Sequence, residues 1–203
     1  MLTIEQTKNM FASAAAKITA AEAELCALDA VCGDGDHGIA IKGAINAANE
    51  AFQSASNIKD AFYDAGFAAM SHSNGSTSTL FGALLMGVSE AVPEGLSKLD
   101  ADAVAKAFEG GLNSVKDNTK ARVGDKTLMD ALIPAVEAMS RESDEKLMFK
   151  AAAEAARKGA ESTKQLQAKF GRARNLGEKS VGSADAGATS TALMFEAFSE
   201  ALE

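Results

Sequence analysis

Apolar residues recur at helical spacing along almost the whole chain. In the first segment one apolar side chain stands every seven residues, at Ile4, Phe11, Ile18 and Leu25. This spacing places the four side chains on one face of a helix. No segment alternates apolar and polar residues in the way that predicts a β-strand. The same periodicity predicts helices over residues 3–28, 38–54, 57–71, 76–92, 100–118, 126–140, 144–169 and 187–202.

The connections between these helices are short, so successive helices should run antiparallel. The 203 residues therefore predict an all-α protein with a single domain, residues 1–203, folded as a bundle of eight antiparallel up-and-down helices. In such a bundle the loops after the first, third, fifth and seventh helices lie at one end. Because those loops hold the most unusual polar residues of the chain, we expect the functional site at that end.

Composition and charge exclude several classes of protein. The net charge of −8 argues against nucleic-acid binding, because phosphate backbones need clustered Lys and Arg. No apolar run approaches the roughly eighteen residues of a membrane span, and the first ten residues lack the basic start and apolar stretch of a signal peptide. The two cysteines do not indicate a disulfide framework, so we expect a reducing, cytoplasmic setting and no membrane partner.

Three aspartates crowd the loop after the first predicted helix. The stretch LDAVCGDGDHG contains Asp29, Asp34 and Asp36 with no basic residue between them. Like charges this close disfavour ionisation unless a cation lies among them. An EF-hand loop starting at Asp34 does not fit, since Gly38 takes the place of its third acidic ligand. Mg²⁺ takes hard oxygen ligands and commonly bridges carboxylates to phosphate oxygens, so the three aspartates are candidate metal ligands.

Two predicted helix entrances share the pattern Gly-x-Thr-Ser-Thr, starting at Gly75 and at Gly187. A helix N-terminus offers unpaired backbone N–H groups and the positive end of the helix dipole, which suit a phosphate. Ser, Thr and Gly are also ordinary capping residues, so one such entrance alone would indicate only a cap. Two of them, beside the aspartates and the Gly-Asp-Lys-Thr loop at 124–127, favour a magnesium–nucleotide site. The chain has no Walker A motif, so it is not a P-loop protein.

The longest irregular stretch, residues 171–190, precedes the last predicted helix. It contains Arg172, Arg174 and Lys179, and then Asp185. An irregular stretch of this length is unusual in a compact bundle and is often functional. We expect this loop to cover the nucleotide and to form a basic rim around the site.

Three stretches resemble the L subunit of dihydroxyacetone kinases, the nucleotide-binding partner in that family. They are LDAVCGDGDHG, ARVGDKTLMDALIPA and GRARNLGEKSVGSADAGATS, and the likeness spans nearly the whole chain. The resemblance implies a closed barrel of eight antiparallel helices with the nucleotide at one end, and two Mg²⁺ ions held by Asp29, Asp34 and Asp36. In the family, a K subunit holds dihydroxyacetone covalently on a histidine, and the L subunit brings the γ-phosphoryl group to it.

The resemblance and the helix entrances together give a set of candidate nucleotide contacts. Backbone N–H groups at the first entrance would hold the phosphates of ADP or ATP, and apolar side chains of the site would face adenine. His37 is expected to support the metal ligands rather than to bind the metal. The candidate nucleotide-binding residues are His37, Asn74, Gly75, Ser76, Thr77, Leu80, Gly124, Thr127, Leu128, Met129, Arg172, Asp185 and Gly187.

The resemblance leaves the phosphoryl donor and the sugar open. Many bacterial L subunits work with a third, phosphotransferase-system subunit that rephosphorylates bound ADP, whereas other members use free ATP. A separate L chain of this size resembles the first kind. The phosphate loop here reads NGSTS, with Asn74 and Ser78 in place of family glycines. The alternatives are an ATP-dependent kinase for another short ketose such as erythrulose, and a nucleotide-sensing module without turnover. A homodimer is also left open.

Overall fold

The computed structural model describes residues 1–73 and 75–203, and it confirms an all-α protein. A short antiparallel sheet, which the sequence did not predict, pairs β1 (Leu2–Thr3) with β2 (Lys98–Leu99). Two 3-10 segments, η1 (Thr163–Gln165) and η2 (Arg172–Ser180), lie between the last two helices. None of the helices in these two ranges is long and apolar enough to span a bilayer. The α-helices of the described residues are α1 (Ile4–Ala20), α2 (Glu22–Cys32), α3 (His37–Ser54), α4 (Ile58–His72), α5 (Ser76–Ala91), α6 (Ala101–Asn118), α7 (Met129–Met139), α8 (Glu145–Ser162) and α9 (Ala186–Glu200).

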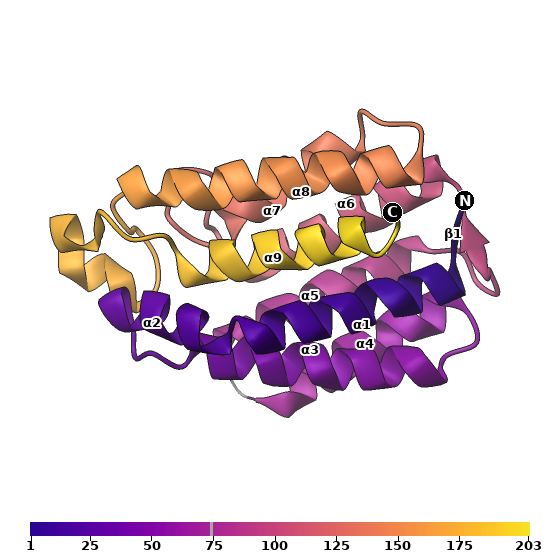
Figure 1. Ribbon diagram of the computed structural model, residues 1–203, viewed down its shortest axis with the longest axis horizontal. Helices are drawn as coiled ribbons and strands as arrows, with labels where there is room; N and C mark the ends of the chain where they lie inside the picture. The colour runs from indigo at the N-terminus through magenta and orange to yellow at the C-terminus, as the bar shows by residue number, and fades with distance from the viewer. Residues whose placement is uncertain (74) are drawn as a thin grey trace.

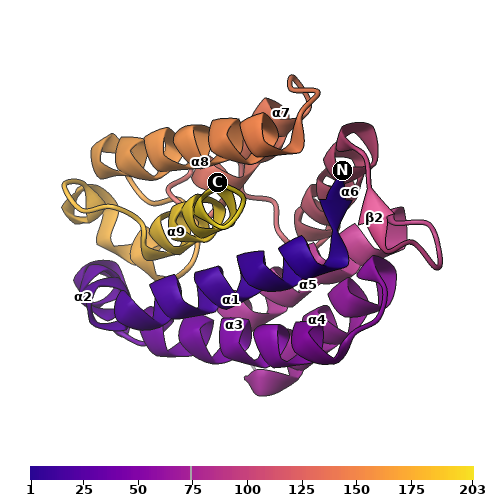
Figure 2. The same ribbon diagram turned by 45° about the vertical axis from the view of Figure 1, so that its right-hand side comes forward.

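Eight of these helices close into a barrel. Going round it, the neighbours in contact are α1, α3, α4, α5, α6, α7, α8 and α9, and α9 packs back against α1. Figure 1 shows the helices running side by side along the longest axis of the molecule, and Figure 2 shows α7, α8 and α9 facing α1, α3 and α4. The closed barrel of eight antiparallel helices that the resemblance implies is therefore confirmed.

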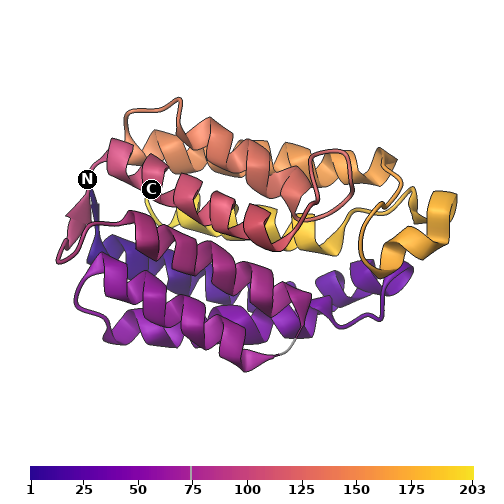
Figure 3. The same ribbon diagram turned by 180° about the vertical axis from the view of Figure 1, so that it is seen from behind.

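The first predicted helix, 3–28, is two helices in the structure. α1 ends at Ala20 and the chain bends at Ala21, whose N–H donates to the carbonyl of Ile18 at 3.2 Å. Because Ile18 and Leu25 on either side of the bend are both fully buried, the apolar period continues across it and does not reveal it. Beyond the bend, α2 packs against α3, α9 and η2, at the end of the molecule that lies away from the N-terminus in Figures 1 and 3.

Two further helix boundaries differ from the prediction. The helix predicted over 144–169 ends at Ser162, where the Thr163 hydroxyl donates to a carbonyl of the last helical turn at 2.5 Å and the backbone tightens into η1. α7 begins later than predicted, at Met129, because residues 122–128 form a turn instead of a first helical turn. Both differences lengthen the irregular segments at the α2 end of the barrel.

Phenylalanines fill the barrel at the end near the chain termini. Phe11 in the middle of α1, Phe52 late in α3 and Phe62 early in α4 contact one another, and the rings of Phe11 and Phe52 stack with centroids 3.9 Å apart. Each fully buried ring contributes roughly 1.5–3 kcal/mol to the free energy of folding. The cluster therefore stabilises this end of the barrel. The ring contacts continue through Phe108, Phe149, Phe195 and Phe198.

Candidate metal and nucleotide site

A cavity of about 690 Å³ opens at the end of the barrel opposite the cluster of Phe11, Phe52 and Phe62. That volume suits a small-molecule ligand, whose pockets are typically about 300–1,000 Å³. Apolar side chains such as Ile18, Ile45 and Leu84 line it within the barrel, and the three aspartates, several hydroxyls and Arg172 line it among the loops. The segments that the up-and-down arrangement placed at one end therefore meet around a single space.

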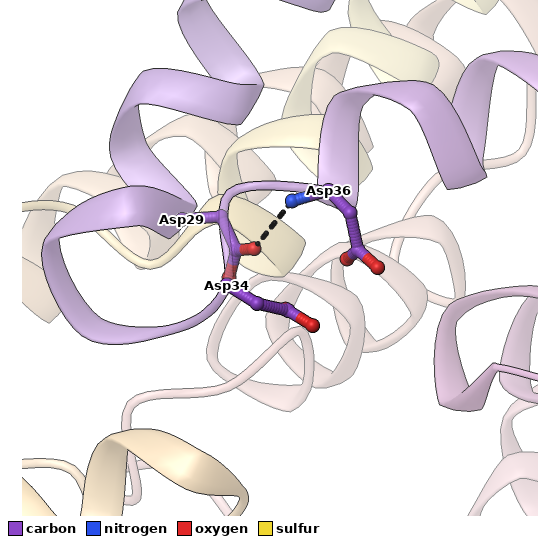
Figure 4. A group of neighbouring side chains, drawn as sticks. All are labelled: Asp29, Asp34 and Asp36. Atoms are coloured by element: carbon purple, nitrogen blue, oxygen red, sulfur yellow. Dashed lines mark hydrogen bonds between the residues drawn. The ribbon is translucent and has the colours of Figure 1, made fainter.

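The three candidate metal ligands lie together at the mouth of this cavity. One carboxylate oxygen from each of Asp29, Asp34 and Asp36 lies within 4.8 Å of the others. Figure 4 shows the three side chains, which come from the last turn of α2, the following loop and the N-cap of α3. Three carboxylates form a hard-oxygen donor set, and the exposure of Asp34 and Asp36 leaves room for water or phosphate oxygens. This donor set fits Mg²⁺.

Asp29 also shapes the loop that carries the other two aspartates. Its Oδ2 accepts hydrogen bonds from the backbone N–H groups of Gly35 at 2.9 Å, Asp36 at 3.1 Å and His37 at 3.4 Å. Gly35 adopts φ +78°, a left-handed conformation that glycine reaches without strain. At Gly33 an added Cβ would clash with Asp29 Oδ1. The two glycines therefore allow the loop to fold around one carboxylate.

Arg172, the first residue of η2, forms an ion pair with Asp34. The arginine side chain is 70% exposed and the aspartate 45%, so the pair lies at the open mouth of the cavity. An exposed pair of this kind adds little to stability, typically about 0–1 kcal/mol. Its effect is to bring a guanidinium, which suits phosphate oxygens, beside the candidate metal ligands.

His37 joins three helix N-termini. Its Nδ1 lies 3.2 Å from Thr77 Oγ1 at the start of α5, and its Nε2 lies 2.9 Å from Ser190 Oγ in the first turns of α9. Burial lowers the pKa of His37 below its ordinary value, although the charge of Asp29 acts in the opposite direction. The imidazole is therefore neutral at pH 7, and both of its nitrogens are occupied by hydroxyls. In this arrangement the ring, which directly follows Asp36 in the chain, ties the aspartate loop to the first turns of α5 and α9.

The two entrances with the pattern Gly-x-Thr-Ser-Thr differ in the structure. α9 is capped by Asp185, whose Oδ2 accepts a hydrogen bond from the N–H of Ala188 at 2.8 Å. At α5 the N-cap is Gly75, and no side-chain cap is found among the described residues. Gly75, Ser76 and Thr77 line the cavity. Of the two entrances, the one at α5 therefore offers N–H groups that no described side chain occupies.

The cap of α9 has an unusual acidity. Burial raises the pKa of Asp185 to about 6, and the negative charges of Asp130 and Asp29 act in the same direction. The hydrogen bond from Ala188 and the positive charge of Lys126 oppose this shift. Asp185, which lines the cavity, therefore keeps its proton to a higher pH than an ordinary aspartate does.

The Gly-Asp-Lys-Thr turn is built around a buried carboxylate. Asp130, with 0% of its side chain exposed, accepts hydrogen bonds from Gly124 N at 2.6 Å and Thr127 N at 2.8 Å. Between them Lys126 adopts φ 60° and is also buried. Its Nζ donates to the carbonyl oxygens of Thr163 at 2.7 Å and Ser183 at 2.5 Å.

Most of the residues selected from the sequence line the cavity. Two do not. Met129 has no exposed surface and belongs to the core, because it begins α7 on the side that faces the barrel interior. The structure therefore places Met129 outside the cavity wall, contrary to the expectation that it faces adenine. Gly124 lies in the turn beside Asp130 and outside the cavity wall. Asn74 lies outside the described residues. Those that line the cavity are Asp29, Asp34, Asp36, His37, Gly75, Ser76, Thr77, Leu80, Thr127, Leu128, Arg172, Asp185 and Gly187.

Several cavity residues were missed by sequence reasoning. Ser190 and Thr191 belong to the second Gly-x-Thr-Ser-Thr stretch, so the repeated pattern could have indicated them. Cys32, Lys126 and Phe170 also line the cavity. Cys32 and Lys126 lie within the LDAVCGDGDHG and Gly-Asp-Lys-Thr stretches, and Phe170 directly precedes residues 171–190, so the sequence indicated their neighbourhood but not these side chains.

Comparison with known proteins assigns the chain to a family. A model of the DAK2 domain family matches residues 31–200. The chain is 34% identical over 172 residues to the ADP-binding subunit DhaL of PEP-dependent dihydroxyacetone kinase 1 from Listeria innocua, covering 84% of this chain and 82% of that subunit. These findings show that the chain belongs to the DAK2 domain family, as a DhaL-type member.

Larger kinases also contain a similar domain. L-erythrulose 1-kinase from Mycolicibacterium smegmatis is 36% identical over 187 residues, and the match covers 89% of this chain and 33% of that enzyme. The crystal structure of the C. freundii dihydroxyacetone kinase in complex with AMP-PNP and Mg²⁺ matches 95% of this chain and 33% of its own, with a TM-score of 0.76 and 26% identity. The chain thus spans most of a DhaL subunit and about a third of these larger enzymes.

Proposed function

We propose that this chain binds a magnesium adenine nucleotide in its cavity and delivers a phosphoryl group to a short ketose held by a partner subunit. The observation that carries the proposal is the gathering of Asp29, Asp34 and Asp36 within 4.8 Å, beside the cavity-lining N-terminus of α5. The C. freundii kinase, whose structure contains AMP-PNP and Mg²⁺, and the ADP-binding DhaL subunits support it.

The proposed roles follow from where each group lies. The three aspartates would hold two Mg²⁺ ions, which when bound would neutralise charge on the phosphates. Backbone N–H groups at the start of α5 would bind phosphate oxygens, and Arg172 would add a guanidinium from the rim. Leu80 and Leu128, which line the cavity, would offer apolar surface to adenine. Phosphoryl transfer needs mainly positioning and charge stabilisation from the protein, and the site is built for both.

For the phosphoryl donor, we propose that ADP stays bound and is rephosphorylated by a phosphotransferase-system subunit. The chain covers 82% of a DhaL subunit whose kinase is PEP-dependent, which favours this arrangement. The second candidate is an ATP-dependent kinase of another short ketose, favoured by the 36% identity to the erythrulose kinase. A nucleotide that survives purification and dialysis supports the first candidate, because an exchanging donor would be lost.

For the acceptor, we propose a K-type partner subunit that carries the ketose and docks on the loop end of the barrel. The exposed pair of Arg172 and Asp34 lies at that end, where a transferable phosphoryl group would be presented. Reconstitution tests this proposal. The chain is mixed with a K-type subunit, the phosphotransferase proteins and phosphoenolpyruvate, and phosphorylation of dihydroxyacetone or erythrulose is measured. Nucleotide binding without transfer in this mixture, and with ATP as donor, would identify a sensing module.

A further inference from the structure

Lys126 combines two features that are costly in a folded protein. Only 3% of the residue is exposed, and among the described residues no carboxylate lies within ion-pair distance of its ammonium. Burial accordingly lowers its pKa, although the charges of Asp185 and Asp130 act in the opposite direction. Its φ of 60° lies in the left-handed region that residues with a Cβ seldom adopt. Such features persist where the surrounding structure holds them in place, commonly at functional sites.

The two acceptors of the Lys126 ammonium mark the ends of one loop. Thr163 O, 2.7 Å from Nζ, lies where α8 ends, and Ser183 O, 2.5 Å from Nζ, lies just before α9. The segment between them contains η2 and its residue Arg172, which pairs with Asp34. One ammonium therefore holds both ends of the segment that covers the mouth of the cavity.

Other hydrogen bonds join the same parts of the chain. Asp185 N donates to Thr163 Oγ1 at 2.8 Å, and Gly182 N donates to Lys164 O at 2.8 Å. Each of these bonds ties the start of the loop to its end. Of these contacts, only those of Lys126 reach both ends from a third element, the turn before α7; the bond to Thr163 is buried and the bond to Ser183 is partly buried. The ammonium is thus placed to set where the loop lies relative to the cavity wall.

We propose that Lys126 is a positioning residue that clamps loop 163–183, so that Arg172 is held over Asp34 and the capped start of α9 faces the cavity. The expectation that loss of Lys126 weakens nucleotide binding rests on the proposed function. The positioning of the loop by Lys126 does not rest on it, since it concerns contacts within the nucleotide-free chain.

Hydrogen exchange of the nucleotide-free protein tests the clamp. Lys126→Met keeps the apolar stem and removes every N–H donor. We expect amide exchange at Gly182 and Asp185 to rise about tenfold or more, because two charge-assisted hydrogen bonds are lost. Amides of α4 and α5 should exchange at the wild-type rate. Lys164→Met is the matched control, because Lys164 lies in the same loop and its side chain, among the residues that the structure describes, pairs only with Glu161 on the surface. It should leave the loop amides unchanged.

A second variant and a binding measurement separate positioning from general stability. Lys126→Gln retains amide N–H donors, so it should restore part of the protection, and it replaces Lys126→Met if that variant does not fold. Calorimetry with Mg²⁺ and ADP should show about tenfold weaker binding in Lys126→Met, with partial recovery in Lys126→Gln, at nearly unchanged apo melting temperature. If the wild-type chain does not bind Mg·ADP, the proposed function fails while the exchange comparison still decides the clamp.

Three results would overturn the clamp. The first is wild-type exchange throughout 163–185 in a folded variant. The second is an increase of equal size in all helices, which would make Lys126 a stabilising residue without a positioning role. Weaker nucleotide binding with unchanged loop exchange would also overturn it, in favour of direct contact between the ammonium and the nucleotide.

Discussion

The carboxylate of Asp29 accepts the backbone N–H of Asp36 at 3.1 Å (Figure 4). One candidate metal ligand therefore orders the backbone of another, through the same Oδ2 that also accepts from Gly35. Asp34 has no such role, since its side chain meets only Arg172 among the ion pairs of the described residues. The three aspartates are thus unequal, and substitutions should separate ligation from loop shape.

Asp34→Asn should abolish measurable Mg·ADP binding and leave the helical circular dichroism intact, because the amide keeps the shape and removes the charge that would hold a cation. Asp29→Ala should also abolish binding, and in addition should speed amide exchange at Gly35 and Asp36, whose acceptor is lost. Calorimetry and hydrogen exchange check the two effects. Wild-type affinity in Asp34→Asn would remove this residue from the set of metal ligands.

Mg²⁺ together with ADP should raise the melting temperature far more than either alone. Mg²⁺ neutralises the charge of both the aspartates and the ADP phosphates. The metal and the nucleotide are therefore expected to bind together. At about one hundred times the dissociation constant the gain is roughly 2.7 kcal/mol, which corresponds to roughly 5–10 °C for a chain of this length. Differential scanning fluorimetry with the four combinations of ligands measures it. A melting curve that the pair does not move would contradict the site assignment.

Arg172→Ala should change the melting temperature of the apo protein by no more than about 4 °C, because an exposed ion pair contributes only about 0–1 kcal/mol. Its affinity for Mg·ADP should nevertheless fall by about tenfold or more, as expected for a charged hydrogen bond to phosphate. Arg174→Ala is the control, since Arg174 lies in the same η2 segment and does not line the cavity. Equal losses in both variants would indicate a general effect of rim charge.

The pH dependence of stability should report on Asp185. Its pKa is raised from 3.8 to about 6 in the folded protein, so the folded state keeps a proton that the unfolded chain has released. Its contribution to the free energy of unfolding is therefore full below pH 3.8 and is lost as pH rises through 6. His37 acts in the opposite direction, because its lowered pKa makes stability rise with pH through its ordinary value of 6.5.

Comparison of the wild type with Asp185→Asn separates the pH dependence that comes from Asp185 from the opposite pH dependence that comes from His37. Asparagine caps helices about as well as aspartate, and His37 is the same in both proteins. Between pH 4 and 6, in magnesium-free buffer, the wild type should lose stability relative to the variant as pH rises. The difference in slope cannot exceed about 1.4 kcal/mol per pH unit, and partial exposure of Asp185 reduces it. Urea unfolding at four pH values measures this; parallel curves would contradict the raised pKa.

The sequence predicts most of the barrel and the acidic cluster for the same reason. Both depend on residues close together in the chain: the apolar period of each helix, and three aspartates within one loop. The bend at Ala21 escapes prediction because the buried positions on both sides keep the same spacing. Met129 is misplaced because it lies at the start of α7, where the rotation of the helix decides which side chain faces the cavity.

The remaining parts of the site depend on contacts between distant segments. Lys126 reaches Thr163 and Ser183, and nothing near position 126 in the sequence indicates either acceptor. The two Gly-x-Thr-Ser-Thr stretches look equivalent as sequence. They differ because Asp185 precedes one of them and caps its helix, whereas no described side chain caps the other. A pattern of residue types can locate helix entrances, but which N–H groups are occupied is settled by the folded chain.

The purified chain, supplied with Mg²⁺ and ATP, should not phosphorylate dihydroxyacetone or erythrulose. The cavity is lined at its mouth by carboxylates, hydroxyls and Arg172, which suit a metal and phosphates. His37 is not free to activate a sugar hydroxyl, because both of its ring nitrogens are held by Thr77 and Ser190. His72 also lines the cavity, but its ring packs against Gly43. Addition of a K-type subunit should restore turnover, and Asp34→Asn should abolish it again. A coupled assay with each component omitted in turn measures this, and ketose phosphorylation by the chain alone would place the acceptor site within this barrel.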